Sequence, residues 1–286
     1  MSENKLSKYY RSPKLYVRIP SQGAFNPDME QSMSGELAVM AMTGRDETMA
    51  KNPDALLNGE AVTSMIKSCV PGIQNPKEIP ITDIDTLLIA IKIATNGEEH
   101  EVSAKCPVCA SEVRGMVNLR DVLPTAKLLE AEYPVKLDTG VTVYVKPYTY
   151  SMQTEAALAA FDETKTLQNL SREKDINSES MSIYNKSFRR MADMSVSLLG
   201  RSIIKVVTPE GEEVTDQEEI FAFIQNIDSN AAKKIDEVLA SINNLDIDKS
   251  IGMKCEKESC LFDKNTLHPS IITLVPLLGV ILIILF

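Results

Sequence analysis

Two cysteine pairs, separated by half of the chain, constrain its fold more than any other feature of the sequence. Cys106 and Cys109 stand in CPVC, and Cys255 and Cys260 stand in CEKESC. Two cysteines three positions apart, between strand-like segments, are typical of half a tetrahedral metal site, in which zinc takes four sulfur ligands. If both pairs bind one ion, the late segment has to return to the early one. The sequence therefore predicts a chain closed on itself by a four-cysteine zinc site.

The second pair is the weaker half of this prediction. Four residues rather than two separate Cys255 from Cys260, although Lys254 and Lys257 beside them would favour the thiolate forms. Four unligated thiols stay open as an alternative, and so does a redox or iron–sulfur site. A zinc ion with four protein ligands would be structural, because it keeps no open position for water. The fifth cysteine, Cys69, is expected to be a buried thiol on the apolar side of a helix.

The composition indicates a globular protein and disfavours nucleic acid as a partner. The chain has 286 residues, of which 44% are hydrophobic, enough for one large domain or two smaller ones. Its formal charge is −10, and such a surface repels phosphate. The basic segment at residues 5–18 is interpreted as an arm that docks on another subunit rather than as a DNA-binding patch. No secretory signal is expected, because the N-terminus shows no apolar stretch followed by a cleavage site.

The first half of the chain predicts strands and helices around one long apolar helix. That helix is expected to begin at Thr82, with Asp85 completing an approximate capping box, and to end at Asn96 and Gly97. A second helical segment is expected over residues 55–69. Strand-like segments precede both helices, at residues 14–20 and 35–43.

The second half of the chain is expected to be mainly helical after the cysteine hairpin. Thr215 and Glu218 form a capping box for one of its helices. The other expected elements are a short helix within 121–132, a β-hairpin over 133–149 that turns at 138–140, two antiparallel helices over 151–204 joined by 171–180, a β-hairpin over 203–214 and a helix over 230–242.

This order of elements predicts the α+β class. The N-terminal part is strand-rich and contains the cysteine hairpin, and the C-terminal part is mainly helical. The expected divisions of the chain are an extended arm at 1–34, an α+β domain at 35–149, a mainly helical region at 150–250, the second cysteine pair at 251–269 and an apolar tail at 270–286.

The sequence offers no constellation for catalysis. Its two histidines, His100 and His268, are far apart, and neither accompanies a recognisable nucleophile. His100 is expected to be an exposed strand residue at the start of the cysteine hairpin. Phosphate-binding loops, the HExxH metalloprotease motif and EF-hand loops are absent from the sequence. A non-enzymatic protein without catalytic residues is therefore expected.

The apolar segment at residues 270–286 carries no charge over its whole length. Its 17 residues reach the lower limit for spanning a bilayer, about 17 to 20 residues. Pro276 and Gly279 would weaken a helix in water, whereas the many β-branched residues permit a buried strand. Because a free tail of this kind would aggregate, it is expected to be covered either by a membrane or by partner subunits, unless it is an artefactual tail.

Several segments of the chain, taken in order, resemble the baseplate hub proteins of contractile-tailed bacteriophages. The most specific part is the helix that ends in TNG and is followed by an acidic strand into CPVC, within residues 81–109. The other segments that carry the resemblance are IPSQGAFNPD, GELAVMAMTGRDE, NPDALLNGEAVTSMIKSCV, VKPYTY and the closing cysteine pair. Members of that family tend to close with CxxC and a short polar or aromatic tail, so CEKESC and the apolar tail are departures.

The resemblance implies a non-enzymatic virion component of the tail tip that is needed for baseplate assembly. Implied partners are other baseplate hub proteins and the tape-measure protein, and the implied location is the virion, with assembly in the host cytoplasm or at the inner membrane. Two alternatives stay open. One is an assembly chaperone absent from the mature virion, and the other is a tail-anchored membrane protein with a zinc-stabilised cytosolic domain.

Overall fold

A computed structural model of the chain describes residues 5–26, 28–106, 109–171, 178–245, 247–248, 250–253, 255 and 270–273. The α-helices are α1 (Gly44–Ala50), α2 (Pro53–Leu57), α3 (Glu60–Cys69), α4 (Ile81–Asn96), α5 (Tyr150–Ser171), α6 (Ser178–Arg201), α7 (Gln217–Asn226) and α8 (Ser229–Asn243). The strands are β1 (Pro13–Val17), β2 (Leu37–Met40), β3 (Glu99–Lys105), β4 (Glu112–Asn118), β5 (Tyr133–Lys136), β6 (Thr142–Val145), β7 (Ile203–Val207), β8 (Glu213–Val214), β9 (Ser250–Met253) and β10 (Ser270–Thr273). Short 3-10 turns are η1 (Ser7–Tyr9), η2 (Pro76–Glu78), η3 (Leu119–Asp121) and η4 (Leu123–Thr125).

The described residues pack around two hydrophobic cores. The first surrounds α4, whose apolar side chains contact α3 and the antiparallel pair β1–β2. The second lies between the antiparallel sheet β5-β6-β7-β8 and the helices α7 and α8. This mixture of helices and antiparallel sheets confirms the α+β class. The division into domains stays a prediction.

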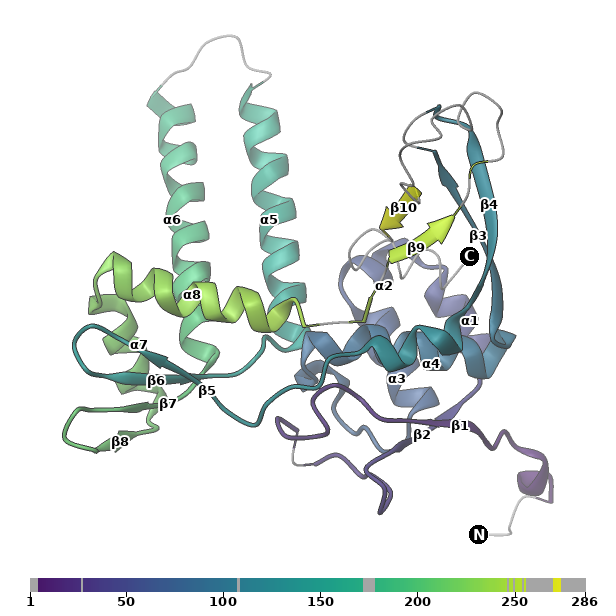
Figure 1. The fold of residues 1–286 in the computed structure, drawn as a ribbon. Helices are drawn as coiled ribbons and strands as arrows, with labels where there is room; N and C mark the ends of the chain where they lie inside the picture. Colours follow the sequence, from purple (N-terminus) through teal and green to yellow (C-terminus); the bar gives the residue numbers. More distant parts are fainter. Residues whose placement is uncertain are drawn as a thin grey trace, which may run out of the picture.

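We call each core, together with the elements packed around it, a lobe. Each lobe carries a hairpin that projects away from its core. The hairpin β3–β4 rises from the lobe that contains α4, and the helices α5 and α6 rise together from the other lobe (Figure 1). The short pair β9–β10 lies beside β3–β4, and β9 contacts β4. The two hairpins are therefore the parts of the described chain that extend furthest from the cores.

Most of the expected elements are confirmed within a few residues. The strands at 14–20 and 35–43 are β1 and β2, the cysteine hairpin is β3–β4, and the hairpin at 133–149 is β5–β6. The helices expected over 151–204 are α5 and α6, the hairpin over 203–214 is β7–β8, and the helix over 230–242 is α8. Residues 172–177 of the expected connector lie outside the described residues.

The predicted start of α4 is wrong, because tertiary contacts replace the expected cap. The helix begins at Ile81, and no side chain caps it. The N–H of Ile81, one of the first N–H groups of the helix, donates to the carbonyl of Tyr148 over 2.9 Å, so a neighbouring segment satisfies it. Thr82 and Asp85 are instead buried inside the helix. The helix does end at Gly97, whose φ of +94° favours glycine.

Three further predictions on element boundaries are wrong. The segment 55–69 is broken by Gly59, whose φ is +76°, so that it forms α2 and α3. The segment 121–132 forms η3 and η4 instead of a short helix, and Pro124 lies within η4. The cap of α7 is Asp216 rather than Thr215, since its carboxylate accepts from the N–H of Glu219 over 3.0 Å.

The apolar tail falls mostly outside the described residues. Its first four residues form β10, which pairs antiparallel with β9 in the register Ser270↔Met253 to Thr273↔Ser250. Residues 274–286 lie outside the described residues, and the prediction that membrane or partner subunits cover the tail stays a prediction. Within the described ranges, no helix is both long enough and apolar enough to cross a membrane.

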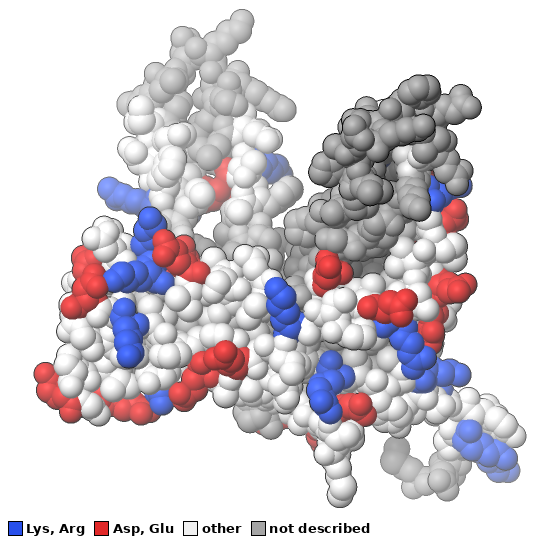
Figure 2. Space-filling model, in the orientation of Figure 1, with Lys and Arg blue, Asp and Glu red and all other residues white. Residues whose placement is uncertain are grey.

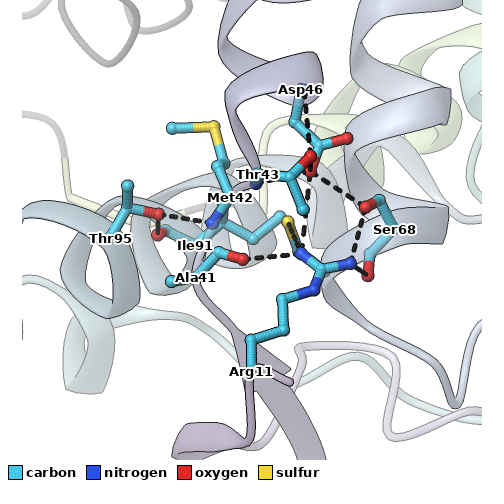
Figure 3. Close-up of polar contacts among 9 residues, drawn as sticks. Arg11, Ala41, Met42, Thr43, Asp46, Ser68, Ile91 and Thr95 are labelled. Atoms are coloured by element: carbon cyan, nitrogen blue, oxygen red, sulfur yellow. Dashed lines mark hydrogen bonds and ion pairs between the residues drawn. The ribbon is translucent and has the colours of Figure 1, made fainter. Parts of the chain in front are cut away.

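A polar cluster around Arg11 fastens the N-terminal segment to the first lobe (Figure 3). The guanidinium donates to the carbonyl of Ser68 over 2.5 Å, to the hydroxyl of Ser68 over 2.7 Å and to the carbonyl of Ala41 over 2.6 Å. It also lies 3.6 Å from the carboxylate of Asp46, which is buried and accepts from the N–H and hydroxyl of Thr43 at the start of α1. One side chain thus joins the segment before β1 to the ends of β2, α1 and α3.

Cys69 lies at the edge of this cluster and is a buried thiol, as predicted. Its side chain is fully buried, and the Nη1 of Arg11 lies 3.7 Å from its sulfur. Burial and, to a lesser degree, the nearby charge of Asp46 raise the pKa of Cys69 to about 11. The thiol therefore stays protonated near neutral pH and is a poor nucleophile.

We expect Arg11→Ala to lower the free energy of unfolding by about 2 kcal/mol, because it removes several charge-assisted hydrogen bonds and leaves Asp46 without its cation. Lys14→Ala, on β1, is the matched control, since Lys14 is exposed and its loss should change stability by less than about 0.5 kcal/mol. Urea denaturation followed by circular dichroism measures both. Equal effects of the two substitutions would contradict the role of the cluster.

Candidate metal centre

Side chains of the β3–β4 hairpin alternate between a buried and an exposed face, and its cysteines lie at one end. Its strands pair in a continuous register from Glu99↔Asn118 to Lys105↔Glu112. Val102 and Val113 turn to the buried face, where they pack with Cys106, and partly with Cys109 and Cys255. The cysteine-bearing turn therefore rests on a small apolar cluster of its own.

Backbone hydrogen bonds shape the turn that holds the first cysteine pair. The N–H of Cys106 donates to the carbonyl of Ser111 over 2.8 Å, and the N–H of Ala110 donates back to the carbonyl of Cys106 over 2.8 Å. Ala110 has a φ of +54°, a left-handed conformation that costs a non-glycine residue about 1–2 kcal/mol. Strained residues of this kind cluster at ligand sites, so the turn has features of a site in which the ligand positions matter.

Three sulfur atoms meet at this end of the hairpin. The Sγ atoms of Cys106, Cys109 and Cys255 all lie within 4.8 Å of one another, and those of Cys109 and Cys255 are 3.7 Å apart. Two sulfurs bound to one zinc ion, each about 2.3 Å from it at tetrahedral angles, would be about 3.8 Å apart. A disulfide would need about 2.05 Å. The three cysteines are thus close enough together to hold a metal ion.

The surroundings of the cluster suit thiolate ligands. Cys106 is buried, and Cys109 and Cys255 are half-buried, so water has limited access to the sulfurs. The hydroxyl of Ser111 lies 2.9 Å from the Sγ of Cys109, where it can donate to a thiolate. The sequence analysis missed both Ser111 and the strain at Ala110, although these are the first two residues after the second cysteine.

The fourth predicted ligand and its neighbours are not described. Cys260 lies outside the described residues, together with Lys254 and Lys257. Cys255 stands two positions after the end of β9, whose contact with β4 brings this late segment to the early hairpin. The structure therefore brings together Cys106, Cys109 and Cys255, and the place of Cys260 stays a prediction.

Among the described residues, His100 does not join the cluster. His100 is paired with Val117 near the opposite end of the hairpin, is partly exposed, and its Nε2 lies 3.1 Å from the carbonyl of Gly97. His268 lies outside the described residues. A separate cavity of about 700 Å³ is lined by apolar and polar residues, many of them from α5 and α8, with Asp236 and Asp248 among its polar groups. Among the described residues, its lining contains no histidine, cysteine or serine.

Comparison with known proteins yields a family match over most of the chain. The sequence profile described as T4 bacteriophage base plate protein matches residues 24–266, a range that includes both lobes and both cysteine pairs. No curated protein and no solved structure matches the chain.

The geometry of the cluster predicts which thiols react with one another. In metal-free protein, mild oxidation with diamide should link Cys255 to Cys106 or Cys109, because short side-chain movements suffice to bring the sulfurs to bonding distance. Cys69 should stay reduced, since it is buried and protonated. Peptide mass spectrometry identifies the links, and protein oxidised in urea is the control in which Cys69 also reacts. Oxidation of Cys69 at the same rate in folded protein would contradict the geometry.

Proposed function

The chain belongs to the T4 bacteriophage base plate protein family, and from this membership we infer that it is a structural, non-enzymatic subunit of the central hub of a phage tail baseplate. The observation that carries the inference is the match over residues 24–266, which includes the cysteine hairpin and the projecting helices. A baseplate role in general follows from the family. The position in the hub, the absence of turnover and a requirement in baseplate assembly are the proposal.

The shape and charge of the molecule support partners that are proteins. Two hairpins extend from the lobes, as expected of a subunit that contacts several neighbours (Figure 1). Acidic side chains gather along the lower left edge in Figure 2, over the sheet β5–β8, and the chain has a net charge of −10. Such a surface disfavours a phosphate backbone. Other hub proteins and the tape-measure protein are the proposed partners.

The cysteine cluster has a structural part in this proposal. Cys106, Cys109, Cys255 and Cys260 would bind one zinc ion, which would tie the segment after β9 to the β3–β4 hairpin. The support is the 3.7 Å separation of two sulfurs, the strained turn at Ala110 and the hydroxyl of Ser111. With four protein ligands the ion would have no open position, so its contribution is stability rather than chemistry.

If the cluster binds zinc, purified protein should contain one zinc ion per chain, and Cys109→Ser should lose it. The substitution should lower the melting temperature by about 10 °C, because a cross-link that closes a loop of more than 100 residues is worth about 4 to 5 kcal/mol. Plasma emission spectrometry and a thermal melt measure the two effects. Cys69→Ala, which removes a thiol outside the cluster, should keep the zinc. Wild-type protein without zinc would contradict the proposal.

If the chain is a hub subunit, mass spectrometry of purified virions should detect it in a fixed ratio to other baseplate proteins. Deletion of its gene should stop tail assembly at or before completion of the baseplate, while capsids still fill. Normal tails from the deletion phage would overturn the proposal. Blocked tails together with a protein absent from virions would instead identify an assembly chaperone. Recovery in host membranes with normal tails would identify a tail-anchored membrane protein.

A further inference from the structure

The outer part of α6 exposes a stripe of large apolar side chains. Met181 and Phe188 are each 51% exposed, and Tyr184 and Met191 are each 45% exposed. Their spacing of three, four and three residues places all four on one side of the helix, and the ring centroids of Tyr184 and Phe188 lie 4.7 Å apart in a tilted arrangement. In Figure 2 the projecting part of α5 and α6 is largely white where it is not grey. We call these four residues the α6 stripe.

The side of α6 that faces α5 buries polar groups beside the half-buried side chains of Ile183 and Met194. Glu163 of α5 and Ser187 of α6 are buried there, and the Nη1 of Arg190 lies 3.4 Å from the Oε1 of Glu163. The second carboxylate oxygen of Glu163 has no hydrogen-bond partner among the described residues. A hairpin that buries a carboxylate and a serine while the rings of Tyr184 and Phe188 stay exposed has not covered its apolar surface within one chain. The α6 stripe therefore indicates an intermolecular contact.

The spacing of the residues in the α6 stripe indicates what kind of partner surface fits it. Met181 and Met191 lie equally far from Lys186 in the sequence, and so do Tyr184 and Phe188. Two copies of α6 that pack antiparallel about a two-fold axis near residue 186 would set methionine against methionine and ring against ring. This self-complementarity is the requirement for an isologous dimer. We propose that the α6 stripe packs against the same stripe of a second copy of this chain, in an antiparallel helix pair.

The charges of the helix are compatible with this pairing. Lys186, Arg189, Arg190 and Asp193 are the charged residues between Met181 and the base of α6 at Arg201, and at 100° per residue they all lie away from the stripe. The flanking residues Asn185, Ser187 and Ala192 are uncharged. The paired helices would thus set no like charges against each other. Because the axis passes through the outer half of the hairpin, the lobes of the two copies would lie at opposite ends of the pair.

The surface area of the α6 stripe determines how strong the proposed dimer is expected to be. Half-exposed side chains of this size lose roughly 100 Å² each on burial, so the two stripes together would bury roughly 800 Å². A standard stable interface buries about 1,600 Å². The dimer is therefore expected to depend on protein concentration and to gain stability when other contacts hold the two copies together.

A cross-linking experiment on the full chain tests both partner and register. Copies with Tyr184→Cys, mixed with differently tagged copies with Phe188→Cys, should form a disulfide between residues 184 and 188 of different copies, identified by peptide mass spectrometry. Lys186→Cys, on the far side of the helix, is the matched control and should cross-link at least tenfold more slowly. Adding Met191→Lys to both partners should reduce the 184–188 link by a similar factor.

Sedimentation equilibrium provides the second readout. The wild-type chain should shift from 31.6 kDa to twice that mass as concentration rises, and Phe188→Lys should shift the midpoint to at least tenfold higher concentration. Circular dichroism should show the same helix content for both, since Phe188 is exposed. Absence of the 184–188 link, or equal linking through residue 186, would overturn the proposal. A chain that stays monomeric and binds a helix of another protein through the stripe would also overturn it.

Discussion

The burial of α4 on all sides is the constraint on which the first lobe depends. Ile84, Ile89 and Ala90 point in three different directions around the helix, and all are buried. A helix that is apolar all round needs cover on every side, whereas an amphipathic helix needs it on one. The cover comes from β1, β2, α3, α5 and the turns η3 and η4, which are drawn from distant parts of the sequence. The polar groups of its first turn are buried as well, and the carboxylate of Asp83 accepts from the N–H of Ser21 over 2.8 Å.

The burial of α4 also helps to explain which parts of the fold the sequence could predict and which it could not. The helical pattern of residues 151–204 and 230–242 predicted α5, α6 and α8, and the alternation around CPVC predicted the hairpin β3–β4. The start of α4 could not be predicted, because the N–H of its first residue, Ile81, bonds to Tyr148, more than 60 residues away, and no side chain caps the helix. For the same reason, the cysteine pattern could indicate a shared site but not the pairing of β9 with β10 or the contact of β9 with β4. Ser111 and Ala110 were overlooked because neither residue type by itself signals a ligand site.

The two hairpins have different roles. One holds distant parts of the chain together, and the other offers a surface to neighbouring molecules. The β-hairpin brings its cysteines to a late segment of the same chain, so its interactions are internal. The helical hairpin keeps a polar side within the chain and turns apolar side chains outward, so its unused surface is available to other molecules. A baseplate subunit needs both properties, because it must keep its shape while several proteins bind to it.

The distance in sequence between Cys109 and Cys255, 146 residues, has a consequence for synthesis. At about 5–20 residues per second, a ribosome needs about 7 to 30 seconds to add the intervening chain. Throughout that interval the nascent polypeptide displays two hairpin thiols without their late counterpart. If these cysteines bind one metal ion, as proposed above, an oxidant present during that interval would meet an incomplete set of ligands, and the yield of correctly closed chains would depend on the reducing state of the producing cell.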